Sequence, residues 1–339
     1  MRVLILGGTH FIGPFVVREL DKLGAAVTVY HRGVHEPALP SAVRHVHHPS
    51  ASLPFLHFPS ELTQPPPDIV LHMFPVGASD TAAAMTRFTG TAGRMVAISS
   101  GDVYRAYGRL IGTEPDSVEP KLLNEDASLR QVLFPYRSAA AGPNDWTYDY
   151  EKILVERAVL SSPQLPGTIL RLPAVYGPGD PQRRFRQYLR RMYDNRPAIF
   201  LDASQSTWRW THGYVENVAA AIVRAIVDER AVGRVFNVGE ENTPMTSERV
   251  AQMAREVQWS GAVIPMPFDR LPPHLRPPYE ARQDLVMDTG RLRRELDFID
   301  PVTRQEGLRR TIDWELTHAV EGEGLHLQYA AEDDLALSG

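Results

Sequence analysis

The 339-residue chain contains no cysteine and very little lysine. The absence of cysteine excludes disulfides, thiolate catalysis and cysteine-ligated zinc. Lysine and arginine together number 36, yet only three of these residues are lysines, namely Lys22, Lys121 and Lys152. Arginine therefore serves as the usual cation, and a lysine at a special position indicates a need for a compact ammonium that can lose its proton.

Long apolar runs and a strong net charge are also missing. The net charge of −5 gives no reason to expect nucleic acid as a partner. No run approaches the roughly 20 apolar residues of a membrane span, and the apolar N-terminal stretch lacks the small-residue cleavage site of a signal peptide. With 43% apolar and 23% charged residues, the chain has an ordinary globular composition. We expect a cytoplasmic protein that acts on a small-molecule substrate.

The N-terminus carries a glycine-rich turn between two predicted elements. Residues 2–6 are a short apolar run that predicts a buried parallel strand, the run Gly7–Gly13 follows, and a helical pattern then extends to Leu23. A dinucleotide-binding fingerprint requires this order of strand, glycine turn and helix, because the pyrophosphate sits on the N–H groups of the helix N-terminus. His10 stands where the middle glycine usually lies, so either the phosphates approach differently or the imidazole contacts them.

Tyr148 and Lys152 are four residues apart, a spacing that places two side chains on one face of a helix predicted near 145–161. A free tyrosine titrates near a pKa of about 10, too high for acid–base chemistry at neutral pH. A neighbouring ammonium favours the phenolate and lowers that pKa. The alternative is an ordinary tyrosine and lysine on the surface of an amphipathic helix.

A serine follows a second predicted buried strand at residues 94–97. Ser100 lies in the run Ile98–Tyr104, at the carboxyl end of that strand, where open α/β sheets bind their ligands. Its hydroxyl is placed to bond the substrate oxygen that Tyr148 would protonate. Alternatively, the serines cap the element that follows.

Strands and helices alternate along the chain. Strands are predicted at 26–31, 43–47, 68–73 and 167–172, and helices near 79–92, 181–194, 215–229, 246–257 and 304–318. The pattern predicts an α/β fold, a Rossmann-type doubly wound parallel sheet with a smaller C-terminal substrate-binding α/β domain. We assign residues 1–176 to the nucleotide domain and 177–318 mainly to the substrate domain, with interleaved segments allowed. Residues 319–339 are expected to form a flexible acidic tail.

Taken in order, these motifs and several later ones resemble an extended short-chain dehydrogenase/reductase of the NAD-dependent epimerase/dehydratase family. The later motifs are Arg171–Gly179, Phe236–Gly239 and Asp288–Leu296, so the resemblance runs from Gly7 to Trp314. It implies a catalytic group of Ser100, Tyr148 and Lys152, in which Lys152 lowers the Tyr148 pKa and bonds the nicotinamide ribose. It also implies two sets of contacts: cofactor contacts at Gly7, Thr9, His10, Phe11, Ile12, Gly13, Arg32, Ser99, Tyr148, Lys152 and Pro173, and substrate contacts at Ser100, Asp102 and Arg209.

The end of the second predicted strand determines the cofactor preference. NAD enzymes commonly place an acid there for the ribose hydroxyls, but this chain reads Val29–Gly33 with no acid. Arg32 favours NADP because a guanidinium pairs with a 2′-phosphate. If Arg32 is a solvated turn residue, either NADP or NAD would bind. His45, His47 and His48 lie close together, but no acid lies in this run and no metal site is predicted.

The sequence indicates the type of reaction more clearly than the substrate. Relatives that act on nucleotide sugars usually carry asparagine where this chain has Ala174, which speaks against that substrate class. Epimerisation of a sugar-type substrate through a keto intermediate is favoured by family, with NADP-dependent ketone reduction or alcohol oxidation as the alternative. A non-catalytic dinucleotide sensor is a third reading. A homodimer is expected because relatives pair the helices predicted near 79–92 and 145–161, whose outer positions include Ile153 and Val155. The alternative is that these apolar positions are buried within the monomer.

Overall fold

The computed structural model describes the whole chain except residues 51–52, 116, 119–121, 319–328 and 338–339. The strands are β1 (Arg2–Leu6), β2 (Ala26–His31), β3 (Arg44–His47), β4 (Ile69–His72), β5 (Arg94–Ser100), β6 (Leu122–Leu123), β7 (Gly167–Leu172), β8 (Ala174–Tyr176), β9 (Ala198–Asp202), β10 (His212–Tyr214), β11 (Val235–Asn237), β12 (Ala262–Met266) and β13 (Val286–Met287). The helices are α1 (Ile12–Lys22), α2 (Ala78–Phe88), α3 (Arg105–Leu110), α4 (Lys152–Leu160), α5 (Arg186–Tyr193), α6 (Ala203–Thr207), α7 (Val215–Val227), α8 (Thr246–Glu256), α9 (Gly290–Leu296), α10 (Arg304–Thr317) and α11 (Tyr329–Leu337).

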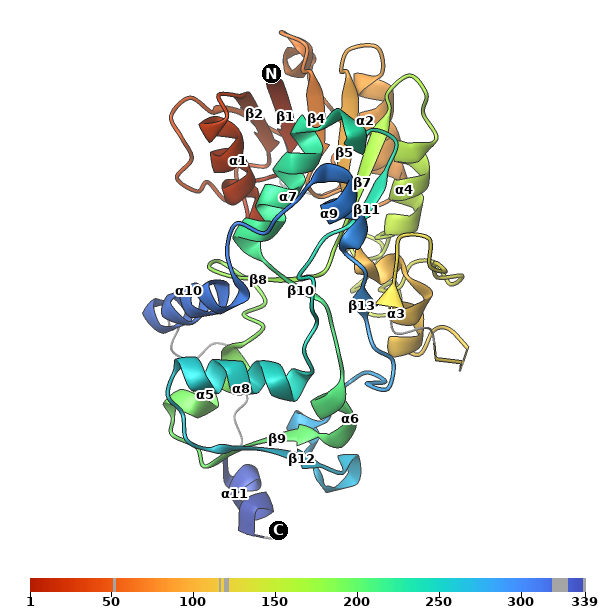
Figure 1. Ribbon diagram of the computed structural model, residues 1–339. Coiled ribbons are helices and arrows are strands. Elements are labelled where there is room, and N and C mark those ends of the chain that lie inside the picture. The colour runs from red at the N-terminus through yellow and green to blue at the C-terminus, as the bar shows by residue number, and fades with distance from the viewer. Residues whose placement is uncertain (51–52, 116, 119–121, 319–328, 338–339) are drawn as a thin grey trace.

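A seven-stranded parallel sheet forms the centre of the first lobe. Its strand order is β11-β7-β5-β4-β1-β2-β3. Helices α1 and α7 cover one face and α2 and α4 the other, so the strands are apolar on both sides (Figure 1). The chain proceeds outward from β1 in both directions, which places the topological switch point between β1 and β4. The predicted fold class is confirmed.

The second lobe consists of short elements below the carboxyl ends of the sheet. Strand pairs β8–β10, β9–β12 and β6–β13 are each parallel, and α5 and α8 pack together beside them (Figure 1). Three elements of the C-terminal half return to the large sheet: α7 packs on α1, β11 pairs with β7, and α9 packs against β11. Residues 215–237 therefore lie with the nucleotide domain in space, although they follow the boundary predicted at residue 177.

The structure departs from the predicted flexible tail at residues 329–337, which form α11 on the lower end of the second lobe (Figure 1). Glu332 in α11 is buried and accepts bonds from Arg191 at 2.6 Å and His274 at 3.1 Å. Leu335 joins a small apolar cluster with Phe200. The acidic residues thus dock this helix by ion pairing. The rest of the predicted tail, 319–328 and 338–339, lies outside the described residues.

The positions expected to support a dimer are buried within the chain. Ile153 and Val155 on α4 are both 0% exposed, because α4 packs against β5, β7 and α2. They therefore offer no apolar surface to a second subunit, which corrects the basis of that prediction. No helix in the described part of the chain is long and apolar enough to cross a bilayer.

Candidate active site

The glycine turn between β1 and α1 lines a cavity of about 530 Å³ at the switch point of the sheet. Gly7 and Gly8 have φ values of +86° and +85°, which favour glycine. A Cβ on Gly13 would lie 2.2 Å from the Gly8 carbonyl oxygen, so only glycine lets α1 start so close to the turn. We call this space the glycine-turn cavity. Six of the residues predicted as cofactor contacts line it: Gly7, Thr9, His10, Phe11, Ile12 and Arg32.

Histidines cluster at the far end of this cavity, where β2 and β3 end. His31 is buried, and desolvation together with His47 and His45 lowers its pKa to about 4. Its Nε2 lies 2.9 Å from Nδ1 of His45. Glu36, from the loop after β2, lies 2.6 Å from Nε2 of His47. The structure thus supplies an acid beside the histidines that the local sequence run does not contain.

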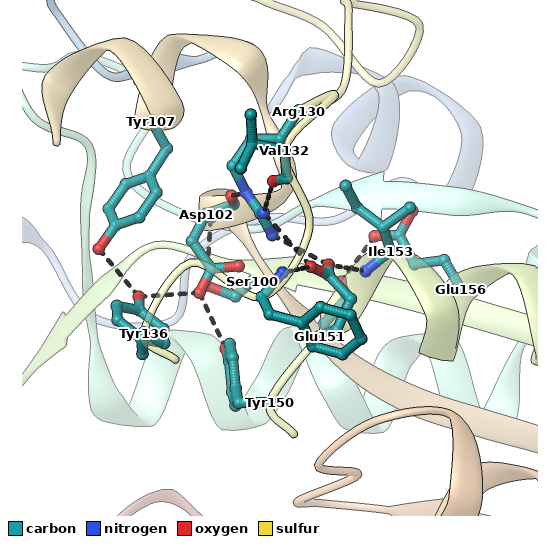
Figure 2. A network of polar contacts seen from close by, with 12 residues as sticks. Ser100, Asp102, Tyr107, Arg130, Val132, Tyr136, Tyr150, Glu151, Ile153 and Glu156 are labelled. Atoms are coloured by element: carbon teal, nitrogen blue, oxygen red, sulfur yellow. Dashed lines mark hydrogen bonds and ion pairs between the residues drawn. The ribbon is translucent and has the colours of Figure 1, made fainter. Parts of the chain in front are cut away.

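A second cavity of about 500 Å³, the central cavity, opens where β5 ends. Ser100 and Asp102 line it together with Tyr107, Tyr136 and Tyr150. Oδ2 of Asp102 accepts hydrogen bonds from the Tyr150 hydroxyl at 2.9 Å and the Tyr136 hydroxyl at 3.1 Å, and Tyr136 also bonds Tyr107 at 2.9 Å (Figure 2). These contacts join a carboxylate and three phenols in one polar network.

Burial sets the protonation of this network. Desolvation raises the pKa of the Asp102 carboxyl, even though Arg130 and the bond from Tyr150 oppose the shift. Desolvation and the Asp102 charge raise the pKa of Tyr150, which also hydrogen-bonds Ser100. Oδ1 of Asp102 is buried without a partner. The network therefore holds protonated phenols beside Asp102, whose Oδ1 can accept one more hydrogen bond.

The predicted pairing of Tyr148 with Lys152 on one helix face is wrong. Helix α4 begins at Lys152, and the residues before it form turns. Glu151 is the N-cap: its carboxylate accepts from the Ile153 N–H and pairs with Arg130 at 2.9 Å, with both charged side chains fully buried (Figure 2). Tyr148 instead lies with its ring 4.7 Å from the Arg137 guanidinium and lines neither cavity.

Lys152 lies behind residues that line the central cavity. Its ammonium donates to the Pro75 carbonyl at 2.5 Å and the Ile98 carbonyl at 3.1 Å. The rings of Tyr150 and Phe74 lie 5.3 Å and 5.5 Å from it. Burial lowers its pKa from 10.5 to about 8. Lys152 is thus a neighbour of Tyr150, and it reaches no cavity wall directly.

Two aromatic side chains connect the cavities. Phe74 and Trp146 line both the glycine-turn cavity and the central cavity, and their ring centroids are 5.1 Å apart. These two rings are therefore walls common to both cavities.

Three further predicted contacts are relocated. Ser99 donates its hydroxyl to Glu156 at 2.6 Å within the buried Arg171–Glu156 ion pair and reaches no cavity. Pro173 lines the central cavity rather than the glycine-turn cavity. Arg209 donates to the Thr243 carbonyl at 2.7 Å and lines a separate surface depression.

A third cavity of about 320 Å³, the outer cavity, continues from the central one. Gln182, Arg184 and Trp210 line both. Arg184, unlike Arg209, lines both the central and the outer cavity.

Comparisons with known proteins bear on the family and the fold of the chain. Residues 134–239 match the model of the NAD dependent epimerase/dehydratase family. The resemblance to this family is confirmed. A similar curated protein is the UDP-N-acetyl-alpha-D-glucosaminuronate decarboxylase of Bacillus cytotoxicus, which is 25% identical over 92% of this chain and 97% of its own length.

Solved structures share the fold. MoeE5 in complex with UDP-glucuronic acid and NAD is 19% identical, with a TM-score of 0.65 over 94% of this chain and 99% of that one. The UDP-glucuronic acid 4-epimerase of Bacillus cereus, in complex with UDP-glucuronic acid and NAD, is 18% identical with the same TM-score and coverage. Both confirm the Rossmann-type architecture with a C-terminal lobe.

Sequence reasoning did not name Tyr150 as a site residue, and it placed Tyr136 only in a substrate-covering loop and Arg184 only in an arginine cluster that could attract an anionic substrate. Tyr150 is only two residues from Lys152, a spacing that does not suggest proximity on a helix. The helix start that places it is an N-cap by Glu151, a residue type not favoured at N-caps, so no sequence signal was present. Tyr136 and Arg184 depend on tertiary packing alone.

Proposed function

We propose that the chain is an NAD(P)-dependent enzyme of the epimerase/dehydrogenase type, with epimerisation of a sugar or sugar-like substrate through a keto intermediate as its favoured reaction. One observation carries the proposal: a cavity built on the dinucleotide turn adjoins a cavity that holds Ser100, Asp102 and Tyr150 at the end of β5. Open α/β sheets bind cofactor and substrate at this crevice.

The glycine-turn cavity suits a dinucleotide. A Cβ on Gly8 would come within 2.7 Å of Ile5, and Gly7 and Gly8 have positive φ, so glycine at these positions lets a phosphate approach the backbone at the start of α1 closely. A bound nicotinamide would accept hydride from, or return it to, a substrate carbon. Arg32 lines this cavity, and its guanidinium would pair with the 2′-phosphate of NADP. Glu36, the acid that follows β2, is paired with His47 rather than placed for the ribose hydroxyls of NAD. Both observations favour NADP over NAD.

The proton route in the central cavity uses Tyr150 rather than Tyr148. Ser100 and Tyr150 hydrogen-bond each other, and we place the substrate oxygen between them. When the substrate hydroxyl is oxidised, its proton passes to the Tyr150 oxygen while the Tyr150 proton moves to Asp102. The reverse transfer protonates the keto oxygen. Lys152 holds Tyr150 from below as a positioning residue.

Reduction of a ketone with release of the product is a second candidate function, because Ser100 and the Tyr150 hydroxyl in the central cavity can also hold and protonate a carbonyl oxygen. In this candidate function the oxidised cofactor leaves after each turnover, whereas an epimerase recycles it in place.

Mass spectrometry of the nucleotide that co-purifies with the chain tests the proposal, followed by calorimetry with NADP and NAD. We expect a nicotinamide dinucleotide and tighter binding of NADP. Retention through purification supports epimerisation, and ready exchange supports ketone reduction. A chain that binds neither dinucleotide would contradict both candidates.

A further inference from the structure

Three imidazoles lie together where the edge strand β3 and its neighbour β2 end. In the parallel register of these strands, His31 is paired with His47. His45 precedes His47 by two residues, so all three side chains point to the same face of the sheet. The ring centroid of His31 lies 4.6 Å from that of His47 and 5.1 Å from that of His45. The strand register thus gathers several nitrogen donors at one point.

The loop between β2 and β3 adds a carboxylate to these imidazoles. An oxygen of Glu36 lies 2.6 Å from Nε2 of His47, and both side chains are about half exposed. One ligand atom each from His31, Glu36 and His47 lies within 4.8 Å of the other two. In the part of the chain that the structure describes, no other three histidine or acidic side chains form such a group. Sequence analysis predicts no metal site because the run of histidines contains no acid, but the fold brings one from the loop.

Two imidazoles and a carboxylate are a donor set that suits Zn²⁺. Tetrahedral Zn²⁺ holds its ligand atoms roughly 3.3–3.6 Å apart, so a small closure of the present spacing is enough. His47 and Glu36 can make this movement because they are exposed, and the ion would replace the hydrogen bond between them. Burial and the neighbouring histidines lower the pKa of His31 to about 4. At neutral pH no proton therefore competes with a metal for this ring.

His31 is the fixed member of the group. It is buried, and its ring nitrogens contact the Gly33 N–H at 3.2 Å and Nδ1 of His45 at 2.9 Å. A histidine ligand keeps its orientation when a second group holds its other nitrogen, and His45 is placed for that positioning role. His31 also lines the glycine-turn cavity. An ion bound to it would therefore lie at the end of that cavity.

We propose that His31, His47 and Glu36 bind one Zn²⁺ ion at the end of the glycine-turn cavity, with His45 holding His31 in place and water in the fourth position. The ion would join β2, β3 and the loop between them. This inference does not rest on the proposed function, because neither a dinucleotide nor a substrate enters the argument.

Calorimetric titration of the full chain with zinc chloride, after treatment with EDTA and removal of the chelator, tests the site. We expect one ion per chain. His47→Ala and Glu36→Gln each remove a ligand at an exposed position, and each should weaken Zn²⁺ binding at least about tenfold, since loss of an outer partner alone costs that much. Co²⁺ is a second probe: the wild type should show the visible absorption of tetrahedral Co²⁺, and both variants should lose it. His318→Ala, at an exposed histidine after α10, is the matched control and should change neither result.

Two results would overturn the inference. One is a wild-type chain that gives no heat with Zn²⁺ and no visible Co²⁺ absorption. The other is Zn²⁺ binding that His47→Ala and Glu36→Gln retain, or that His318→Ala weakens equally, because the ion would then bind adventitiously to surface histidines. Failure of the proposed function gives a different pattern, in which the chain binds no dinucleotide yet still binds Zn²⁺ through His47 and Glu36.

Discussion

The glycine-turn cavity and the central cavity adjoin each other but are built in different ways. The first has one wall of continuous backbone, the run Gly7–Ile12 from β1 into α1, and other walls from segments such as the loops after β2 and β4. The second assembles side chains from separate segments, among them Ser100, Tyr136 and Tyr150. A site built from local backbone is fixed once the strand, turn and helix form, whereas a site built from side chains depends on where each helix begins and how loops pack.

The largest effect should come from the residue that sets the start of α4. Glu151→Ala removes the N-cap and leaves Arg130 as an unpaired buried cation, so we expect the free energy of unfolding to fall by about 3–5 kcal/mol. Urea unfolding measures this loss. Glu306→Ala, which breaks exposed pairs on α10, is the control and should cost no more than about 1 kcal/mol. Equal losses would show that Glu151 does not hold the central cavity together.

The cofactor preference depends on one side chain in the glycine-turn cavity. Arg32→Gln should weaken NADP binding by about 1.5–3 kcal/mol, the worth of a hydrogen bond to a charged group, while NAD binding stays unchanged. Calorimetry with both dinucleotides measures the difference. Arg18→Gln, on α1 but outside the cavity lining, should leave both affinities as they are. Equal losses for NAD and NADP would remove the argument for NADP.

The backbone nature of the glycine-turn cavity can be tested with a single methyl group. Gly13→Ala places a Cβ against the Gly8 carbonyl, and overpacking of this kind should destabilise the chain by about 1–3 kcal/mol and weaken dinucleotide binding. Gly24→Ala is the matched control, because its Cβ would meet no atom within 4 Å and only its φ of +71° opposes the change. Thermal unfolding and calorimetry report both properties. Normal dinucleotide binding by Gly13→Ala would contradict the close approach.

The smallest predicted effect is a pH dependence from Lys152. Burial lowers its folded-state pKa to about 8, below the unfolded value of 10.5, so between these values the unfolded chain binds more protons. Stability from this residue should therefore rise as the pH increases through that window, by about 1 kcal/mol per pH unit, with the full burial penalty present below it. Urea unfolding of the wild type and Lys152→Met at about pH 8 and about pH 9.5 measures the difference. Identical pH profiles would show that Lys152 titrates normally.

Much of the fold follows from the sequence because its signals are local. The strand over 2–6 and the helix over 215–229 were predicted almost to their ends, since apolar periodicity reports burial directly. The glycine turn between β1 and α1 could also be predicted, because its glycines lie within seven consecutive residues. The helix near 145–161 begins seven residues later than expected, because the buried Arg130–Glu151 pair joins residues distant in sequence. Such tertiary contacts also decide that Tyr150 and Arg184 line the central cavity, whereas Tyr148 and Arg209 do not.

The central claim is that Tyr150, rather than Tyr148, transfers the proton in the cavity beside the dinucleotide. The most direct test compares Tyr150→Phe with Tyr148→Phe for the rate at which a probe alcohol reduces added NADP, with dinucleotide affinity measured in parallel. We predict that Tyr150→Phe lowers the rate by at least about 100-fold with unchanged affinity, while Tyr148→Phe stays near the wild type. Loss of turnover in Tyr148→Phe with activity retained in Tyr150→Phe would contradict the account.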